Sequence, residues 1–174
     1  MEYQQEREQL ATAARRLAAE GLVHGTAGNA SVRVGEVALV TPTGAVLGDI
    51  APADISAVDV ESGEVRAGPS PTSELAIHLR AMRTHGAGAV VHTHSPKACA
   101  AGCVVEELPV VHYAMTLFGG PVRATPYLTF GTPELAEAAL AALEGRSAAL
   151  LSNHGAIVLG EDIGHAVDLA RLLE

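Results

Sequence analysis

The chain has 174 residues, a length typical of one domain, and its 48% hydrophobic but only 3% aromatic residues require a core built from alanine, valine and leucine. The formal net charge of −9 disfavours nucleic-acid binding and requires that any bound anion be held by local donors. No apolar stretch has membrane-spanning length, and the polar, acidic start argues against a signal peptide, so we expect a cytoplasmic protein.

The first third of the chain predicts one helix and two hairpins. Residues 4–20 have apolar positions at helical spacing without Gly or Pro, and Gly21 is a plausible end of that helix. Residues 32–40 and residues 55–66 each predict two short strands joined by a turn that contains Gly. These hairpins indicate that at least part of the sheet is antiparallel.

The middle of the chain predicts a helix, a strand and a second helix. Thr72 or Ser73 is expected to cap a helix that runs to about residue 85. The apolar run 88–91 predicts a strand that leads into a pair of histidines. Pro96 suits the first turn of the helix that follows.

The last third alternates strands and helices. Helices are expected to begin after Thr132, which is followed by Pro, and after Asp162. Further strands are expected at residues 109–112, 122–126, 148–152 and 156–159. Short hairpins mixed with helices predict a single layered α/β domain over residues 1–174.

Three histidines form the most informative pattern. His92 and His94 lie two residues apart at the end of an expected strand, so alternation places both rings on one face. His154, which lies between two expected strands, could supply a third nitrogen. Any single histidine is more often a surface or hydrogen-bonded residue, but the set favours a metal site with an open fourth position, as in catalytic zinc sites. We expect no metal at the others, His24, His78, His85, His112 and His165, and we expect His78 to be exposed or packed at a helix end.

Glu74 and the residues before it have two interpretations. Thr72-Ser73-Glu74 is readily explained as a helix cap followed by an acidic residue that favours the helix dipole. If Glu74 lies beside the metal, however, its carboxylate could be a ligand in the resting site or a general base.

Two loops combine glycine with hydroxyl and amide side chains. Residues 25–31 and 41–44 could be ordinary turns, or they could hold an anion with backbone N–H groups and hydroxyls. Neither loop matches a nucleotide-binding glycine pattern. Together with Thr72 and Ser73 at a helix start, they could surround a phosphate.

Six short motifs follow one another along the chain: Gly25-Thr26-Ala27-Gly28-Asn29, Thr41-Pro42-Thr43-Gly44, Pro71-Thr72-Ser73-Glu74, His92-Thr93-His94, His112-Tyr113 and Asn153-His154-Gly155. In this order they resemble the motifs of the class II aldolase/adducin family, and the similarity is greatest to its L-fuculose-1-phosphate aldolases. The resemblance covers nearly the whole chain.

The resemblance implies a three-layer α/β/α sandwich around a mostly antiparallel sheet, assembled as a homotetramer with active sites between subunits. It implies Zn²⁺ or another divalent transition metal on the three histidines. It also implies a substrate-phosphate site formed by Gly28, Asn29, Thr43, Gly44, Thr72 and Ser73.

The implied reaction is the reversible cleavage of a phosphorylated ketose to dihydroxyacetone phosphate and an aldehyde. Zinc acts there as a Lewis acid, Glu74 as the acid/base, and Tyr113 of a neighbouring subunit assists the proton step at the aldehyde oxygen. Without the resemblance, simple packing would explain Tyr113.

Other reactions of the family remain as alternatives. Its pentulose-phosphate epimerases typically have Lys at the position of Thr41 and Asp at that of Glu74, so this chain is more similar to the aldolases. Dehydratases of the family differ in the segment after the histidine pair, and a non-catalytic adducin-like module would be expected to lack the histidines. Family members usually continue beyond the last helix with a tail that covers the site, so we expect such a tail to be missing from residues 1–174.

Overall fold

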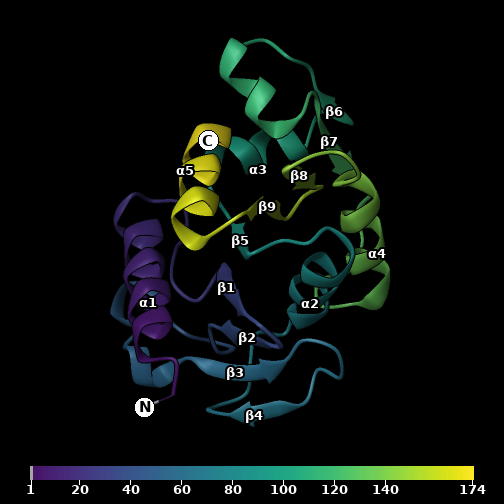
Figure 1. The fold of residues 1–174 in the computed structure, drawn as a ribbon. Helices are drawn as coiled ribbons and strands as arrows, with labels where there is room; N and C mark the ends of the chain where they lie inside the picture. The colour runs from purple at the N-terminus through teal and green to yellow at the C-terminus, as the bar shows by residue number, and fades with distance from the viewer. Residues whose placement is uncertain (1) are drawn as a thin grey trace.

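The structure is a computed structural model that describes residues 2–174. Its centre is a nine-stranded sheet in the order β4-β3-β2-β1-β5-β9-β8-β7-β6, which runs through the middle of the molecule in Figure 1. The strands are β1 (Asn29–Val34), β2 (Val37–Val40), β3 (Ser56–Asp59), β4 (Val65–Ala67), β5 (Ala89–Thr93), β6 (Glu107–Leu108), β7 (Val122–Thr125), β8 (Ala148–Leu151) and β9 (Gly155–Gly160).

Neighbouring strands are antiparallel except for one pair. Strands β7 and β8 run parallel, with Ala124 opposite Leu150, and every other neighbour pair is antiparallel. The two hairpins expected near the start of the chain are present as β1–β2 and β3–β4. The prediction of a mostly antiparallel sheet is therefore confirmed.

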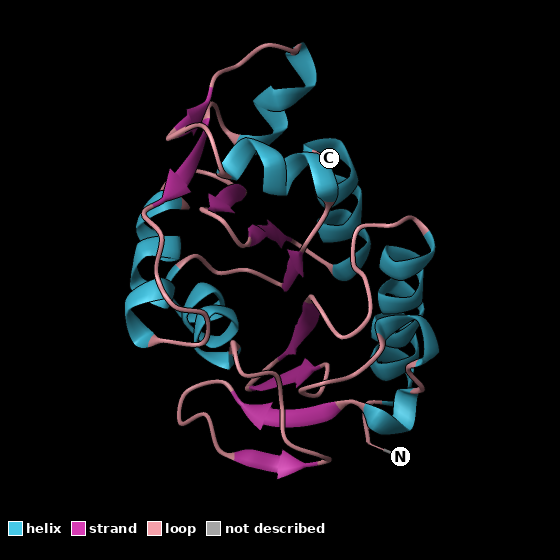
Figure 2. Cartoon of the chain, turned by 180° about the vertical axis from the view of Figure 1, so that it is seen from behind, coloured by secondary structure: helices cyan, strands magenta, loops and turns pink. Residues whose placement is uncertain are grey.

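Helices cover both faces of the sheet, as Figures 1 and 2 show from opposite sides. One core packs α1 and α5 against the sheet, and a second core packs α2 and α4 against its other face. This is the expected three-layer arrangement. The helices are α1 (Gln4–Ala19), α2 (Leu75–Thr84), α3 (Pro96–Gly102), α4 (Pro133–Ala142) and α5 (Ile163–Leu173), with 3₁₀ helices η1 (Leu47–Asp49), η2 (Pro52–Asp54) and η3 (Tyr113–Phe118).

Local chemistry sets the start of the last two long helices where the sequence predicts it. The Thr132 hydroxyl accepts the Leu135 N–H at 3.3 Å, and the Asp162 carboxylate accepts the His165 N–H at 2.8 Å. Each bond satisfies an N–H group that has no partner within its helix. Pro133 then occupies the first turn of α4, where a missing N–H costs nothing.

Two predictions about secondary structure are wrong. No strand covers residues 109–112, because β6 ends at Leu108 and the apolar Val110 and Val111 that suggested a strand are exposed. Thr72 and Ser73 do not cap α2 either. The Thr72 N–H is bonded to the Thr41 carbonyl, which keeps that segment extended, so the helix begins only at Leu75 with Glu74 as its N-cap.

In the described part of the chain, residues 2–174, no helix combines the length and apolarity needed to cross a bilayer.

Candidate metal centre and active site

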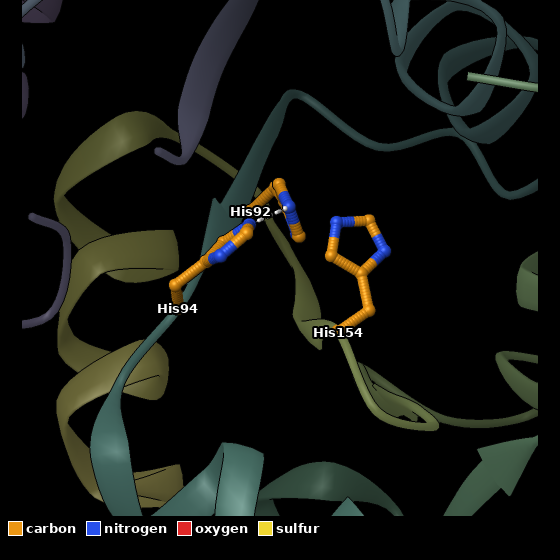
Figure 3. A group of neighbouring side chains, drawn as sticks. All are labelled: His92, His94 and His154. Carbon is orange, nitrogen blue, oxygen red and sulfur yellow. Dashed lines mark hydrogen bonds between the residues drawn. The ribbon is translucent and has the colours of Figure 1, made fainter. Parts of the chain in front are cut away.

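The sheet brings the three histidines together, as Figure 3 shows. His92 lies on β5, and His94 follows its last residue. His154 lies in the short turn between β8 and β9. Because β9 pairs with β5, with Ile157 opposite His92, this turn is held next to the end of β5.

The three rings face a common point. Their nearest ligand atoms all lie within 4.8 Å of one another. The ring centroids are separated by 4.7, 4.8 and 4.9 Å, so the rings form a nearly equilateral triangle. The Nε2 atoms of His92 and His94 are 2.9 Å apart. Convergence of this kind is what coordination of one ion by three imidazoles requires.

Backbone contacts fix the orientation of His92. Its Nδ1 lies 2.9 Å from the carbonyl oxygen of Ala156 on the neighbouring strand. A carbonyl can only accept, so Nδ1 carries a proton, and Nε2 is the nitrogen that faces the other histidines and is placed to bind a metal. Metal-binding histidines commonly have this outer hydrogen bond.

Two glycines allow the backbone to approach the histidines. A Cβ atom on Gly155 would lie 2.2 Å from the Thr93 carbonyl oxygen and 3.1 Å from the His92 ring. A Cβ atom on Gly28, whose φ is +81°, would lie 2.4 Å from the Val23 side chain and 3.0 Å from the His92 carbonyl oxygen. Glycine is therefore required at both positions for the loops to close around the site.

Burial keeps two of the three imidazoles neutral. It lowers the pKa of His94 to about 4, with a smaller contribution from the neighbouring His92 and His154. Burial, and then His92, also lowers the pKa of His154 below its ordinary value. Neutral rings at physiological pH have the free lone pairs that a metal ion needs.

Glu74 lies beside the triangle, at the N-terminus of α2. Its carboxylate is buried, with Oε2 at 3.1 Å from His92 Nε2 and Oε1 at 3.6 Å from His154 Nε2. Burial alone would raise the pKa of Glu74, but the neighbouring His92 and the hydrogen bond from the Asn29 amide hold this pKa below its ordinary value. The group is thus an ionised carboxylate in position to be a ligand or a base.

These residues fit a divalent metal ion. Glu74 Oε1 and His154 Nδ1 are buried and have no hydrogen-bond partner within the described chain. A buried polar atom without a partner destabilises the fold. An ion held among the three rings and the carboxylate would give Glu74 Oε1 a partner directly. Three nitrogens and an exchangeable carboxylate are typical of zinc and similar transition metals.

A cavity of about 430 Å³ opens beside the histidines. It lies between the residue 26–29 loop, the residue 42–44 loop and the start of α2. All of the expected phosphate-site residues line it, and so does Phe130, which the sequence reasoning did not identify. These are Gly28, Asn29, Thr43, Gly44, Thr72 and Ser73.

Tyr113 is not part of this cavity. Its side chain is 82% exposed, and its ring lies against that of His112, with centroids 4.6 Å apart and planes tilted by 38°. A larger hollow of about 790 Å³ lies next to Asn153, but none of the three histidines lines it. Chemistry rather than size therefore identifies the site.

His78 is not exposed, which was one of the two placements expected for it. The His78 side chain is fully buried and forms hydrogen bonds with Asn29 and Ser31, at the inner edge of the site. The signal in the sequence is the spacing of four between Glu74 and His78, which places both on one face of α2.

The sequence of residues 8–174 matches the family of class II aldolase and adducin N-terminal domains. The chain belongs to this family. With the histidine site, this makes it a class II aldolase, a metal-dependent lyase. The family expected from the sequence motifs is therefore confirmed.

Named relatives and solved structures agree. The chain is 44% identical to a 5-methylthioribulose-1-phosphate/5-deoxyribulose-1-phosphate aldolase of Rhodospirillum rubrum, over 92% of this chain and 73% of the relative. It is 37% identical to an L-fuculose phosphate aldolase of Escherichia coli, over 88% of this chain and 72% of the relative. A solved L-fuculose 1-phosphate aldolase superposes with a TM-score of 0.93 at 33% identity, over 98% of this chain and 82% of that one.

Proposed function

We propose that this aldolase cleaves a ketose 1-phosphate reversibly to dihydroxyacetone phosphate and an aldehyde. One observation supports this most strongly: a buried carboxylate, Glu74, lies beside a convergent histidine triangle and lines the same cavity as the hydroxyl residues Thr43, Thr72 and Ser73. A phosphate and the adjacent carbonyl of one substrate could then reach both halves of the site together. We propose zinc as the metal.

For the substrate we propose a ribulose 1-phosphate modified at carbon 5, with L-fuculose 1-phosphate as the next candidate. The Rhodospirillum rubrum relative that is named for such substrates is 44% identical, against 37% for the fuculose relative. A relative from Bacillus thuringiensis, named a 5-deoxy-D-ribulose 1-phosphate aldolase, is 36% identical over 98% of this chain. All of these substrates share the dihydroxyacetone phosphate half and differ in the aldehyde half.

The phosphate would be held by the loops rather than by lysine or arginine. Asn29, Thr43, Thr72 and Ser73 line the cavity, and Gly44 has a φ of +70° that turns the backbone of its loop. Backbone N–H groups and hydroxyls arranged in this way bind oxyanions without a net positive charge. This suits a chain whose formal charge is −9.

Glu74 would move the proton. When the bond between carbons 3 and 4 breaks, the hydroxyl of carbon 4 would lose its proton, assisted by Tyr113 of a neighbouring copy, and become the aldehyde carbonyl. Negative charge develops on the dihydroxyacetone half, and His92, His94 and His154 would hold the ion nearby. The ion would supply Lewis-acid stabilisation of that charge. Glu74 would then deliver a proton to carbon 3, and it would remove the same proton in the synthetic direction.

We also propose that copies of this chain assemble, as a homotetramer. Large apolar side chains are exposed along residues 104–130, and a group of exposed apolar side chains of this size is typical of a protein–protein interface. A second copy of this chain would cover them and could place Tyr113 at the site of its neighbour. They are Val104, Val110, Val111, Tyr113, Leu117, Tyr127 and Phe130.

A substrate panel tests the proposal. Purified protein is incubated with the 1-phosphates of 5-deoxyribulose, 5-methylthioribulose, fuculose and rhamnulose, and with ribulose 5-phosphate. We expect dihydroxyacetone phosphate and aldehyde from the 1-phosphates, with the first two cleaved fastest. An epimerised or dehydrated product would identify another reaction of the family, and no reaction with any compound would favour a non-catalytic module.

A further inference from the structure

A line of buried hydrogen bonds leads from the protein interior to the carboxylate of Glu74. Ser31 Oγ lies 2.7 Å from His78 Nδ1, and His78 Nε2 lies 2.5 Å from Asn29 Oδ1. Asn29 Nδ2 donates to Glu74 Oε2 at 2.9 Å. All four side chains are buried, so water does not compete for these bonds.

The elements of the fold place these residues in pairs. Asn29 and Ser31 are two residues apart on β1 and point to the same side of the strand, toward α2. Glu74 and His78 are four residues apart at the start of α2 and face the strand. The strand and the helix are therefore joined here by three side-chain hydrogen bonds.

The charge of Glu74 fixes the direction of every bond in the line. An ionised carboxylate only accepts, so Asn29 must present its NH₂ group to Glu74 and its carbonyl oxygen to His78. His78 Nε2 must then carry a proton, and Nδ1 of the neutral ring accepts from the Ser31 hydroxyl. Burial lowers the pKa of His78 to about 4, which agrees with a neutral ring.

We propose that His78 and Ser31 are positioning residues that hold the Asn29 amide in one orientation and, through it, aim the Glu74 carboxylate at the reacting carbon. This rests on the proposed function of Glu74 as the acid/base. It also gives Asn29 a second task, because its carbonyl oxygen and one N–H are engaged within the line and only the other N–H remains for a phosphate.

The alternative is that the line only stabilises the fold. The two roles differ in what the loss of His78 would do. Without the Nε2–H donor, the Asn29 carbonyl is left unpaired, and the amide can turn its oxygen toward Glu74. The carboxylate would then be repelled from its position, while the metal histidines and the phosphate loops would stay as they are.

His78→Phe and His78→Gln test the role by activity. The glutamine amide can place an N–H near the position of Nε2, whereas phenylalanine cannot. We expect kcat to fall about 10- to 100-fold in His78→Phe, with KM and metal content little changed, because small misplacements of a catalytic group have effects of this size. On a logarithmic scale, we expect the kcat of His78→Gln to lie at least halfway from that of His78→Phe to that of the wild type.

Ser31→Ala has a matched control in Ser56→Ala. Ser56 is equally buried on β3, its hydroxyl donates to the Pro69 carbonyl, and neither residue lines the cavity. We expect Ser31→Ala to lower kcat severalfold and Ser56→Ala to leave kcat unchanged at a similar cost in thermal stability. Three results would each overturn the proposal. They are an equal kcat in these two serine variants, a kcat of His78→Gln as low as that of His78→Phe, and a loss of activity that follows a loss of metal.

A spectrum of the wild-type protein tests the line without activity. Long-range ¹H–¹⁵N correlation on histidine-labelled, metal-free protein reports which ring nitrogen of His78 is protonated. We expect the neutral Nε2–H form at pH 7, and an Nδ1–H form would contradict the direction of the line. If the wild type cleaved no ketose phosphate, the proposed function would fail, and this spectrum would still decide whether the line exists.

Discussion

Two regions of the molecule reverse the usual arrangement of polar and apolar side chains. At the site, Asn29, Glu74, His78 and His92 are buried although all are polar. Along residues 104–130 the reverse holds, and the chain exposes large apolar side chains such as Val111, at 75%, and Leu117, at 61%.

The difference shows how each region obtains its partners. The buried polar groups find theirs within the chain and, by our proposal, in one metal ion, so their positions are fixed by the fold. The exposed apolar groups have nothing to cover them within the described residues. Their partner must come from outside, and we propose another copy of the chain. The predictions below test each region separately, from the largest expected effect to the smallest.

Removal of the metal should have the largest effect. We expect dialysis against a chelator to lower turnover of the best substrate of the panel at least about 1000-fold, because Lewis-acid stabilisation is worth several kcal/mol. Adding Zn²⁺ back should restore it. Full turnover by protein shown to be free of metal would mean that the histidine triangle has another purpose.

Glu74→Gln should be the most damaging change that leaves the metal in place. The glutamine is similar in shape but cannot take up a proton, so we expect turnover to fall about 10²- to 10⁴-fold. Metal content should stay within the range of the wild type. Glu137→Gln, on the exposed side of α4, is the control and should be fully active. Near-normal turnover in Glu74→Gln would remove this carboxylate from the proton step.

The buried line also predicts a pH dependence of stability. The pKa of His78 is about 4 in the folded chain and about 6.5 when unfolded, so the unfolded chain binds the extra proton. Above about pH 6.5 His78 is neutral in both states and does not change the unfolding free energy. As the pH drops from about 6.5 toward 4, the unfolded chain takes up a proton at His78 and the unfolding free energy falls. The difference corresponds to about 3 kcal/mol of unfolding free energy.

Urea unfolding of metal-free protein at several pH values measures this effect. Contributions from the other groups are shared, so the comparison is between the wild type and His78→Gln. We expect the wild type to lose stability more steeply between pH 6.5 and 4. Parallel curves for the two proteins would show that His78 titrates normally.

The smallest effect on the chain itself should come from Leu117→Glu. A surface substitution of this kind should change the unfolding free energy of one chain by no more than about 0.5 kcal/mol. It should nevertheless dissociate the assembly, as measured by sedimentation velocity. Leu172→Glu, on α5 and outside residues 104–130, is the control and should leave the assembly intact. A wild type that sediments as a monomer would contradict the proposed assembly.

The parts of the fold predicted correctly depend on local chemistry. The starts of α4 and α5 follow from Thr132 and Asp162, whose side chains cap their own helices. The three histidines were identified because His92 and His94 share one strand face, and His154 stands beside a glycine in a turn between two expected strands.

The errors arise where distant contacts decide. The sequence predicts His78 to be exposed or packed at a helix end, because the pattern of α2 does not reveal that β1 presents Asn29 and Ser31 to it. The strand expected at residues 109–112 is absent because the apolar Val110 and Val111 there do not face the core of this chain. Apolar patterning indicates burial but does not say whether the covering surface belongs to the same chain.

Metal stoichiometry tests the central claim most directly. The wild type and His154→Ala are expressed in zinc-supplemented medium, and bound transition metal is counted per chain by elemental analysis. The histidine triangle predicts about one ion per chain in the wild type and a large loss in His154→Ala, with both proteins folded. Less than about half an ion per chain in the wild type, or equal metal in the two proteins, would contradict it.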